Sequence, residues 1–293
     1  MRNFRYFVLT LVSFFLLSAR ADEFKFPLKP GSVRFAAIGD MGTGDSGQYQ
    51  TAERMAVTHQ TFPFEFVITL GDNIYGGSSP KDFVKKFETP YKPLLNAGVK
   101  FYASLGNHDN PNERLYKPFN MSDSTYYTFK KGNVRFFALD SNYMDAKQLQ
   151  WLQKQLADAG NNDWKICYFH HPLYSDGKSH GSSIELRALI EPLFIKYGVD
   201  AVFSGHDHVY ERLKPEKGIY YFLEGSSGQL HSGGLAKSSI TEQGNDSDRT
   251  FMLIEIAGDE MYFETLTRTG RQIDSGVLRR PVRTPPPTNA GSK

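Results

Sequence analysis

Hydrophobic residues along the chain follow two patterns. Short, unbroken apolar runs predict buried β-strands, and longer segments with an apolar residue every three or four positions predict helices that lie on a sheet. The expected strands span residues 32–38, 66–70, 99–105, 165–169, 199–203 and 219–223. The expected helices span residues 46–60, 80–91, 145–159 and 182–197. A chain of 293 residues with these elements can form one large α/β domain or two small ones.

Two further pairs of apolar runs predict β-hairpins. Residues 126–129 and 134–139 flank the turn sequence Lys131-Gly132-Asn133, and residues 251–256 and 261–267 flank Gly258-Asp259. Just before the second hairpin, residues 225–248 are rich in glycine and serine. That composition predicts a long surface loop, close to the chemically active residues described below.

The two ends of the chain differ in composition from the rest. Arg2 and Arg5 precede an apolar stretch, and Ala19-Arg20-Ala21 is a small-x-small cleavage sequence. This order predicts a signal peptide over residues 1–21, so we expect a secreted or periplasmic protein. Residues 281–293 hold consecutive prolines and small polar residues, which predicts a disordered tail. The folded domain is then expected over residues 22–280.

Charge and cysteine content narrow the possible classes of protein. The full chain has a formal net charge of +2, and residues 1–21 carry three arginines and no acid. The exported chain is therefore close to neutral, which gives no indication of binding to nucleic acid or, after cleavage, to a membrane. Cys167 is the one cysteine, so no intramolecular disulfide can form. It lies in a strand-like run and is expected to be a small buried side chain rather than a nucleophile.

Side chains able to bind metal follow the ends of five predicted strands. Asp40 by itself would be interpreted as a solvated turn residue. The repetition at successive strand ends, mostly beside glycine, indicates a shared site, because ligands bind at the carboxyl ends of strands in open α/β sheets. These residues are Asp40; Asp72 and Tyr75; Asn107 and His108; His170; and His206 and His208.

The donor set indicates two metal ions. A mixture of Asp, His, Asn and Tyr argues against a structural zinc site, which favours thiolates. If Asn107 and His108 supply one ligand between them, seven ligands remain, which is too many for one first-row ion. Seven suit two ions that share a carboxylate, an arrangement about 3.5–4 Å across that serves displacement at phosphorus. A hydroxide held by the metals, its pKa lowered by them, would be the attacking group.

These motifs together resemble the metallophosphoesterase superfamily, and Tyr75 narrows the resemblance to the purple acid phosphatases. The matching motifs are Asp40-x-Gly42, Gly71-Asp72-x-x-Tyr75, Gly106-Asn107-His108-Asp109, His170 and Gly205-His206-x-His208. The resemblance implies an α/β fold with four layers, in which two mixed β-sheets are flanked by helices. It also implies that residues 22–280 form a single catalytic domain, as in the small members of the family.

The resemblance assigns the seven ligands to two ions. Asp40, Tyr75 and His208 would bind Fe(III). Asn107, His170 and His206 would bind a divalent ion, which could be iron, zinc or manganese. Asp72 would bridge the two. The chemistry agrees with this division, because an anionic phenolate suits Fe(III), whereas an amide and two imidazoles suit a softer divalent ion.

Further residues are implied to face the substrate. Asn107, His108 and His180 would lie near the phosphate, and one of the two histidines would donate a proton to the leaving alkoxide. His180 is the weaker assignment, because it lies in a loop over residues 175–183. Asp109 is expected to orient His108.

The other histidines are expected to have lesser roles. His171, beside Pro172, is interpreted as structural. His59 and His231 are expected at the surface, with His231 able to line the mouth of the pocket. Asn120 and Asn245 are in glycosylation sequences, which matter only if the source is eukaryotic.

The sequence therefore predicts a dinuclear acid phosphatase that hydrolyses phosphomonoesters. A phosphodiesterase or nucleotidase on the same scaffold is left open, because the pocket walls lie in loops. A binding protein that keeps the fold without catalysis is the other alternative. It would be expected to lack at least one ligand, and all seven are present.

Overall fold

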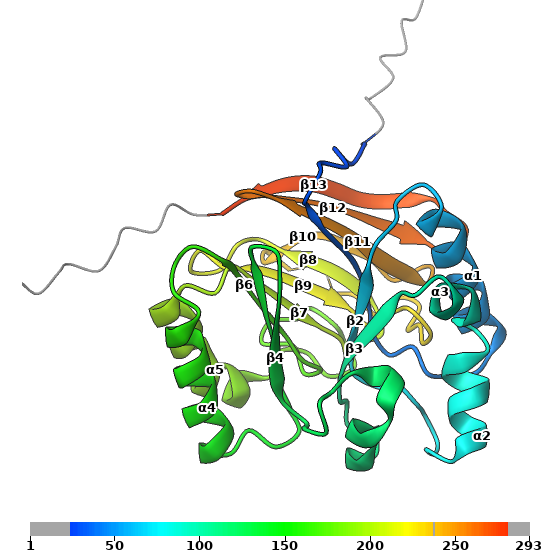
Figure 1. Cartoon of the computed structure of the whole chain (residues 1–293), viewed down its shortest axis with the longest axis horizontal. Helices are drawn as coiled ribbons and strands as arrows, with labels where there is room; N and C mark the ends of the chain where they lie inside the picture. The colour runs from blue at the N-terminus through cyan, green and yellow to red at the C-terminus, as the bar shows by residue number, and fades with distance from the viewer. Residues whose placement is uncertain (1–23, 237, 281–293) are drawn as a thin grey trace, which may run out of the picture.

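The computed structural model describes residues 24–236 and 238–280. These residues form two β-sheets that pack face to face, with helices on their outer faces (Figure 1). The predicted signal peptide, residues 1–21, and the predicted tail, residues 281–293, lie outside the described residues. Within the described part of the chain, no helix is long and apolar enough to cross a membrane.

The first sheet has six strands. Their order is β13 (Gln272–Arg279), β12 (Glu260–Thr267), β11 (Thr250–Ala257), β1 (Val33–Ile38), β2 (Phe66–Leu70) and β3 (Lys100–Ser104). β1, β2 and β3 are parallel, and β11 to β13 form an antiparallel meander beside β1. The carboxyl ends of β1, β2 and β3 therefore lie at the same edge of this sheet.

The second sheet has seven strands. Their order is β10 (Thr241–Asn245), β8 (Tyr210–Leu213), β9 (Tyr220–Glu224), β7 (Ala201–Ser204), β6 (Trp164–Tyr168), β5 (Val134–Ala138) and β4 (Tyr127–Lys131). β5, β6, β7 and β9 are parallel, while β4, β8 and β10 run antiparallel to their neighbours. The predicted hairpin over residues 126–139 is present as β4 and β5.

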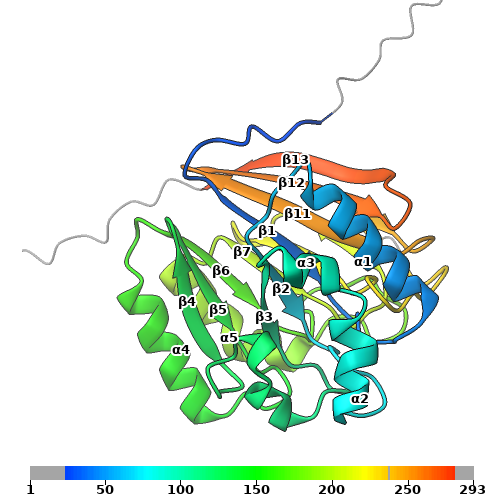
Figure 2. The ribbon, with the colours of Figure 1, turned by 45° about the vertical axis from the view of Figure 1, so that its right-hand side comes forward.

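Helices form the two outer layers (Figure 2). On the six-stranded sheet lie α1 (Ser46–His59) and α3 (Lys92–Asn96), and on the seven-stranded sheet lie α4 (Ala146–Asp158) and α5 (Ile184–Tyr197). α1 and α4 each begin after an aspartate, Asp45 or Asp145, whose side chain accepts a hydrogen bond from the first helical turn. α5 ends at Gly198, which adopts a φ of 65° that glycine tolerates without strain.

Aromatic side chains fill the space between the sheets. On β5, Phe136 packs into the core between the sheets, and the next residue, Phe137, packs into the separate cluster under α4 and α5. This alternation is the two-residue period of a strand buried on both faces. The ring of Phe35 on β1 lies 5.2 Å from the ring of Phe136 and 6.2 Å from that of Phe203 on β7. The predicted arrangement, two mixed sheets flanked by helices, is confirmed.

Some predicted elements were wrong in detail. The helix expected over residues 80–91 is a short α2 (Pro80–Phe83) that continues as a π-helical segment (Val84–Glu88). The loop expected over residues 225–248 contains β10, a polar edge strand paired with β8. β8 and β13 were not predicted either. Each of these three strands lacks the unbroken apolar run of a central strand, because β10 and β13 lie at sheet edges and β8 lies next to one.

Candidate metal centre

The predicted ligands meet where the strand ends of the two sheets converge. Asp40 follows β1, Asp72 follows β2 and Asn107 follows β3, whereas His170 follows β6 and the other two histidines follow β7. Three of these residues have left-handed backbone conformations, with φ of 51° at Asp40, 52° at Asp72 and 76° at His206. Such conformations cost a non-glycine residue about 1–3 kcal/mol each, and they cluster at functional sites. The chain therefore turns sharply at three strand ends to aim side chains into one place.

One group of contacts joins Asp40, Tyr75 and His208. The Tyr75 hydroxyl donates to Asp40 Oδ1 over 3.1 Å and lies 3.3 Å from His208 Nε2. His208 Nε2 is in turn 3.5 Å from Asp40 Oδ1. The other carboxylate oxygen of Asp40 accepts a hydrogen bond from the backbone N–H of His206 over 2.9 Å. These contacts bring together the three side chains assigned to the first ion.

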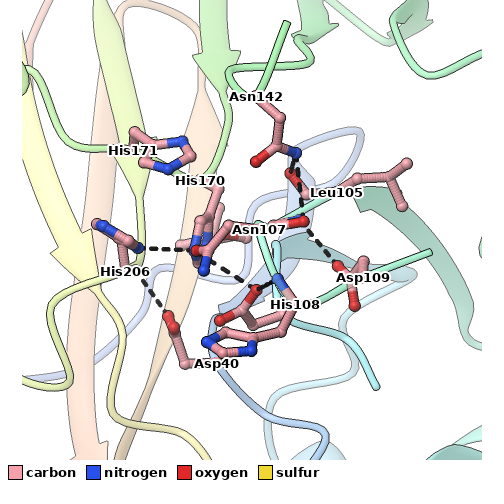
Figure 3. Close-up of polar contacts among 12 residues, drawn as sticks. Asp40, Leu105, Asn107, His108, Asp109, Asn142, His170, His171 and His206 are labelled. Carbon is pink, nitrogen blue, oxygen red and sulfur yellow. Dashed lines mark hydrogen bonds and ion pairs between the residues drawn. The ribbon is translucent and has the colours of Figure 1, made fainter. Parts of the chain in front are cut away.

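A second group joins Asn107, His170 and His206 (Figure 3). His170 Nδ1 lies 2.9 Å from the carbonyl oxygen of Leu70, so this nitrogen carries the proton and donates it. His170 Nε2 then presents a lone pair toward Asn107 Oδ1 at 2.9 Å and His206 Nδ1 at 3.0 Å. Electron-rich atoms that face one another in this way form a place for a cation. A carbonyl that orients a histidine is also a usual partner of a metal ligand.

Asp72 lies between the two groups. Its Oδ1 is 3.5 Å from His170 Nε2 in the second group. Ligand atoms of Asp72, Asp40 and His208 all lie within 4.8 Å of one another, which links Asp72 to the first group. The backbone N–H of His108 donates to Asp72 Oδ1 over 3.0 Å and holds the carboxylate in place. One carboxylate therefore contacts both groups of ligands.

Burial gives the site a charge pattern suited to cations. The side chains of Asp40 and Asp72 are 0% and 1% exposed. Burial, and then the charge of Asp72, raise the pKa of Asp40 well above its ordinary value. Burial also lowers the pKa of His170, and burial with the neighbouring His170 lowers the pKa of His206 to about 2. Neutral imidazoles are the form that binds metal, and a bound cation would compensate the buried carboxylates.

His108 and His180 flank this cluster. The ring of His108 lies 5.0 Å from the ring of Tyr75, next to the first group. The ring of His180 stacks on the ring of His206, with centroids 3.9 Å apart and planes at 29°, next to the second group. Both side chains are exposed, so they are accessible to a molecule that binds at the cluster.

His171 has a position that its sequence context did not predict. Its Nδ1 bonds the Ser141 hydroxyl over 2.8 Å, which is a structural contact, but its ring also lies 4.4 Å from that of His206. It lines a hollow of about 380 Å³ beside the cluster, together with Asn107, Asn142 and Tyr143. The Asn142 amide donates to the carbonyl oxygens of residues 105 and 106 (Figure 3). The adjacent His170 was the available signal, but the loop bend that turns both rings inward cannot be derived from spacing.

The expectation for Asp109 was wrong. Its carboxylate does not turn to the His108 ring but accepts hydrogen bonds from Asn73 Nδ2 at 2.7 Å, Ile74 N at 3.0 Å and Gly106 N at 2.8 Å. Asp109 thereby ties the turn after β3 to the turn after β2. It positions the backbone that carries Asn107 rather than a histidine ring.

The remaining expectations concern residues farther away. His59 is partly buried, with Nε2 3.0 Å from the Phe64 carbonyl oxygen. His231 is exposed, as expected, and its Nδ1 contacts the Ser179 hydroxyl. The amides of Asn120 and Asn245 donate to backbone oxygens in the fold, and a glycan on either nitrogen would take the place of one of its two hydrogens.

Comparison with known proteins agrees with this geometry. The family model of the calcineurin-like phosphoesterases matches residues 33–210. The chain belongs to this family. The matched region contains all seven predicted ligands, and the predicted membership of the metallophosphoesterase superfamily is confirmed.

The chain is also similar to named phosphatases. Tartrate-resistant acid phosphatase type 5 of Mus musculus is 27% identical over 308 residues, which is 85% of this chain and 91% of the relative. The human protein of the same name is 28% identical over 86% of this chain and 92% of its own length. Purple acid phosphatase 15 of Arabidopsis thaliana is 30% identical over 61% of this chain and 40% of its own length. The resemblance to the purple acid phosphatases is thus confirmed.

Solved structures show the same fold. The Plasmodium protein GAP50, described as the anchor in the inner membrane complex, superposes with a TM-score of 0.77 and 22% identity over 87% of this chain and 90% of that one. The purple acid phosphatase PPD1 of yellow lupin seeds superposes with a TM-score of 0.73 and 18% identity over 91% of this chain and 58% of that one. One of these two proteins is named as a phosphatase and the other as an anchor. The fold by itself therefore does not indicate catalysis, and the ligand set has to be considered.

Proposed function

We propose that this chain is an exported acid phosphatase that hydrolyses phosphomonoesters with two metal ions. One observation carries the proposal: six ligand side chains fall into two contact groups, and the buried Asp72 contacts both. The names of the relatives, tartrate-resistant and purple acid phosphatases, support the activity. The complete set of seven ligands favours an enzyme over a protein that uses the fold only as an anchor.

Two different ions suit the two groups. In the proposal, Asp40, Tyr75 and His208 hold Fe(III), and Asp72 is shared. Burial and the neighbouring carboxylates raise the pKa of the Tyr75 phenol, so a phenolate there needs a strong Lewis acid, for which Fe(III) is suited. A divalent iron, zinc or manganese ion would occupy the second group of Asn107, His170 and His206. When bound, the pair of ions would supply electrophilic activation of the phosphate and an activated water.

Three side chains of this chain are then available to the phosphate ester. Asn107 and His108 are exposed at the rim, and His180 covers His206. In the proposal, His108 and His180 donate hydrogen bonds to the phosphate oxygens. One of them protonates the departing alkoxide, which is otherwise a poor leaving group. This step needs an exposed proton donor rather than a further metal ligand.

The visible absorption spectrum and the metal content of the purified protein test the metal assignment. We expect a broad visible band with iron bound, retained in Tyr127→Phe and lost in Tyr75→Phe. Tyr127→Phe is the matched control, because it removes a buried hydroxyl that bonds the Ala103 carbonyl away from the site. A colourless protein with two divalent ions would keep the phosphoesterase and overturn the iron. A protein that binds no metal would overturn the proposal as a whole.

A phosphodiesterase is the second candidate, and one observation favours it. The hollow of about 380 Å³ beside the cluster adjoins another of about 410 Å³, and both are lined by Ser141 and His171. Space of this size could receive the second ester group of a diester. Rates on a chromogenic monoester and on the matching diester decide between the two. A higher kcat/KM for the monoester supports the phosphatase, and the reverse order supports the phosphodiesterase.

Export is part of the proposal and has its own test. The basic, apolar and small-residue order of residues 1–21 supports a cleaved signal peptide. Amino-terminal sequencing of protein recovered from outside the cytoplasm should begin at Asp22. A mature chain that still begins at Met1 would overturn this part and leave the catalytic proposal intact.

A further inference from the structure

The loop that carries His180 is held by a side chain from between two metal ligands. Asp207 separates His206 from His208 and is 1% exposed. We propose that Asp207 is a positioning residue: it fixes His180 over the metal centre and affects the reaction through that histidine. This inference rests on the proposed function, in which His180 contacts the phosphate.

The contacts of the Asp207 carboxylate go to one loop. Oδ1 accepts a hydrogen bond from the backbone N–H of His180 over 3.0 Å. Oδ2 accepts from the backbone N–H of Gly181 over 2.9 Å and from the Ser175 hydroxyl over 2.6 Å. A carboxylate that receives several N–H and O–H donors forms stronger hydrogen bonds than a neutral acceptor. The donors come from both ends of residues 175–183, so the carboxylate links the two ends of the loop, as does the Ser182 hydroxyl through its bonds to the Ser175 backbone.

The loop approaches Asp207 more closely than a side chain would allow. A β-carbon on Gly177 would lie 2.2 Å from Asp207 Cγ. Glycine at this position lets the backbone pass over the carboxylate and curl back toward His180. Asp207 lies between His206 and His208 in the chain, so its backbone is directly joined to both proposed ligands. The position of the loop therefore depends on the position of the proposed metal ligands rather than on the protein surface.

Other parts of the molecule also hold the loop, and one of these contacts, between the Ser179 hydroxyl and His231 Nδ1, is next to His180. The N–H of Asp176 donates to Glu211 Oε2 over 2.9 Å. On the opposite side, the N–H of Lys178 donates to the Gly234 carbonyl oxygen over 2.8 Å. These contacts support the first half of the loop. Among the described contacts, the hydrogen bond to the backbone of His180 itself comes from Asp207, so its loss should displace this ring in particular.

The chemistry of asparagine makes Asp207→Asn a specific test. The amide keeps the size of the carboxylate but presents one oxygen and one NH₂ group. Two backbone donors, from His180 and Gly181, would then face one acceptor, and one of them would lose its partner. The ring of His180 would no longer be held 3.9 Å from that of His206. The hydrogen bonds of the Asp207 carboxylate go to Ser175, His180 and Gly181 rather than to the His206 or His208 ring, so we expect the metal content to stay the same.

The experiment is a double-mutant cycle on the metal-loaded enzyme with a chromogenic phosphomonoester. Asp207→Asn, His180→Ala and the double variant are compared by kcat, KM and metal content. We expect Asp207→Asn to lower kcat/KM by about tenfold to a hundredfold, as a small misplacement of a substrate-contacting group does. In the His180→Ala background the same change should have less than about a twofold effect. Asp274→Asn, which alters a buried aspartate that bonds Tyr210 and Arg212 rather than the loop of His180, is the control for general destabilisation and should leave kcat/KM unchanged.

A second variant, Gly177→Ala, tests the same inference if Asp207→Asn folds poorly. Gly177→Ala leaves Asp207 intact but places a methyl group against its carboxylate. It should give the same loss of kcat/KM, again dependent on His180. Independent effects of Asp207→Asn and His180→Ala, or loss of metal from Asp207→Asn, would overturn the inference.

Failure of the proposed function gives a different result. A metal-loaded wild-type protein without activity on any phosphate ester would overturn the phosphatase. Binding of inorganic phosphate, measured by calorimetry, would then still test Asp207. Equal weakening in Asp207→Asn and His180→Ala, with no further loss in the double variant, would support the positioning role, and unchanged binding in Asp207→Asn would overturn it.

Discussion

Asp40 and Asp72 place two carboxylates in a region that water hardly reaches. Both are almost fully buried, and their ligand atoms lie within 4.8 Å of each other and of His208. Two like charges under these conditions destabilise a fold, because neither is well solvated and each repels the other. The ligands of a dinuclear site therefore oppose folding until cations bind.

This repulsion predicts that Asp72→Asn has opposite effects on the free energy of unfolding without and with bound metal. In the presence of a chelator, the variant should have a free energy of unfolding about 1–2 kcal/mol higher than the wild type, because one buried charge is gone. With metal present the order should reverse, because the variant loses a ligand that contacts both groups. Urea unfolding in both conditions measures the two differences. Greater stability of the wild type in chelator would show that the carboxylates do not strain the metal-free fold.

Glu224 predicts a separate dependence of stability on pH. Its side chain at the end of β9 is fully buried and bonds the Thr250 hydroxyl at 2.8 and 2.9 Å. Burial raises its pKa from 4.5 to about 8. The folded protein thus binds this proton more tightly than the unfolded chain, so the contribution of Glu224 to stability is full below about pH 4.5 and is lost as the pH rises to about 8.

Glu224→Gln should remove that dependence. The amide is neutral at every pH, so the variant and the wild type should be similar in stability at pH 5. At pH 8 we expect the free energy of unfolding of the variant to exceed that of the wild type by about 2–4 kcal/mol more than at pH 5. Glu260→Gln, which changes a partly exposed acid, is the matched control. A constant difference across this range would mean that Glu224 is not protonated in the fold.

At the scale of single residues, the sequence predicted which side chains gather at the strand ends better than it predicted the residues that support them. The ligands follow strand ends, where chain direction and the preceding apolar run are both visible in the sequence. The roles of Asp109 and Asp207 depend on loops that fold back across the site, and nothing in their spacing reveals which donors will reach them. The position of His171 was not predicted for the same reason, because its place in the wall of the hollow depends on how the loop after β6 bends.

At the scale of elements, β8 and β13 hold the two sheets together at the side of the molecule. Arg212 on β8 bonds Asp274 on β13 through Nε at 2.7 Å and Nη2 at 3.1 Å. The Tyr210 hydroxyl also donates to Asp274 Oδ2 over 2.7 Å. β8 belongs to the seven-stranded sheet and β13 to the six-stranded sheet. This largely buried contact is therefore a polar link between layers whose other contacts are mainly apolar.

Asp274→Asn should weaken that link. The change removes the charge that faces a half-buried Arg212, which leaves an uncompensated guanidinium, and we expect a loss of about 2–3 kcal/mol in the free energy of unfolding. Glu260→Gln, which affects the more exposed pairs with Lys29 and Arg279, should have a much smaller effect on stability. Urea unfolding measures both. Equal losses would show that the link between the sheets carries no special stability.

The elements also show where prediction from sequence stops. Central strands are buried on both faces, so their apolar runs were recognised, and both hairpins were located by their turns. β10, with the sequence Thr-Glu-Gln-Gly-Asn, has a mostly polar surface and pairs with β8 through its backbone and through one side-chain hydrogen bond, from the Thr241 hydroxyl to Glu211. Backbone pairing of an edge strand requires no particular side chains. Such a strand can be found only once its neighbour is in place.

At the scale of the whole molecule, the proposed metal ligands come from both sheets. Asp40, Asp72 and Asn107 follow strands of the six-stranded sheet, while His170 and His206 follow strands of the seven-stranded sheet. Bound metal would therefore hold together the same two layers that the aromatic core holds together. Metal binding and the aromatic core both oppose separation of the sheets. A change in either one should therefore alter both the unfolding temperature and the temperature at which metal is released.

Thermal unfolding of the metal-loaded protein should accordingly be one transition in which metal is released. Its midpoint should rise with the concentration of free metal, because the ions bind the folded chain and not the unfolded one. Phe136→Ala removes a ring that lies 5.2 Å from Phe35 across the sheets, and it should lower the free energy of unfolding by about 3–5 kcal/mol. Metal release, followed by a chromogenic chelator, should move to lower temperature by the same amount as unfolding. Release of metal well below the unfolding temperature would show that the strand ends can separate while the aromatic core stays closed. Bound metal would then stabilise only the loops that bear its ligands.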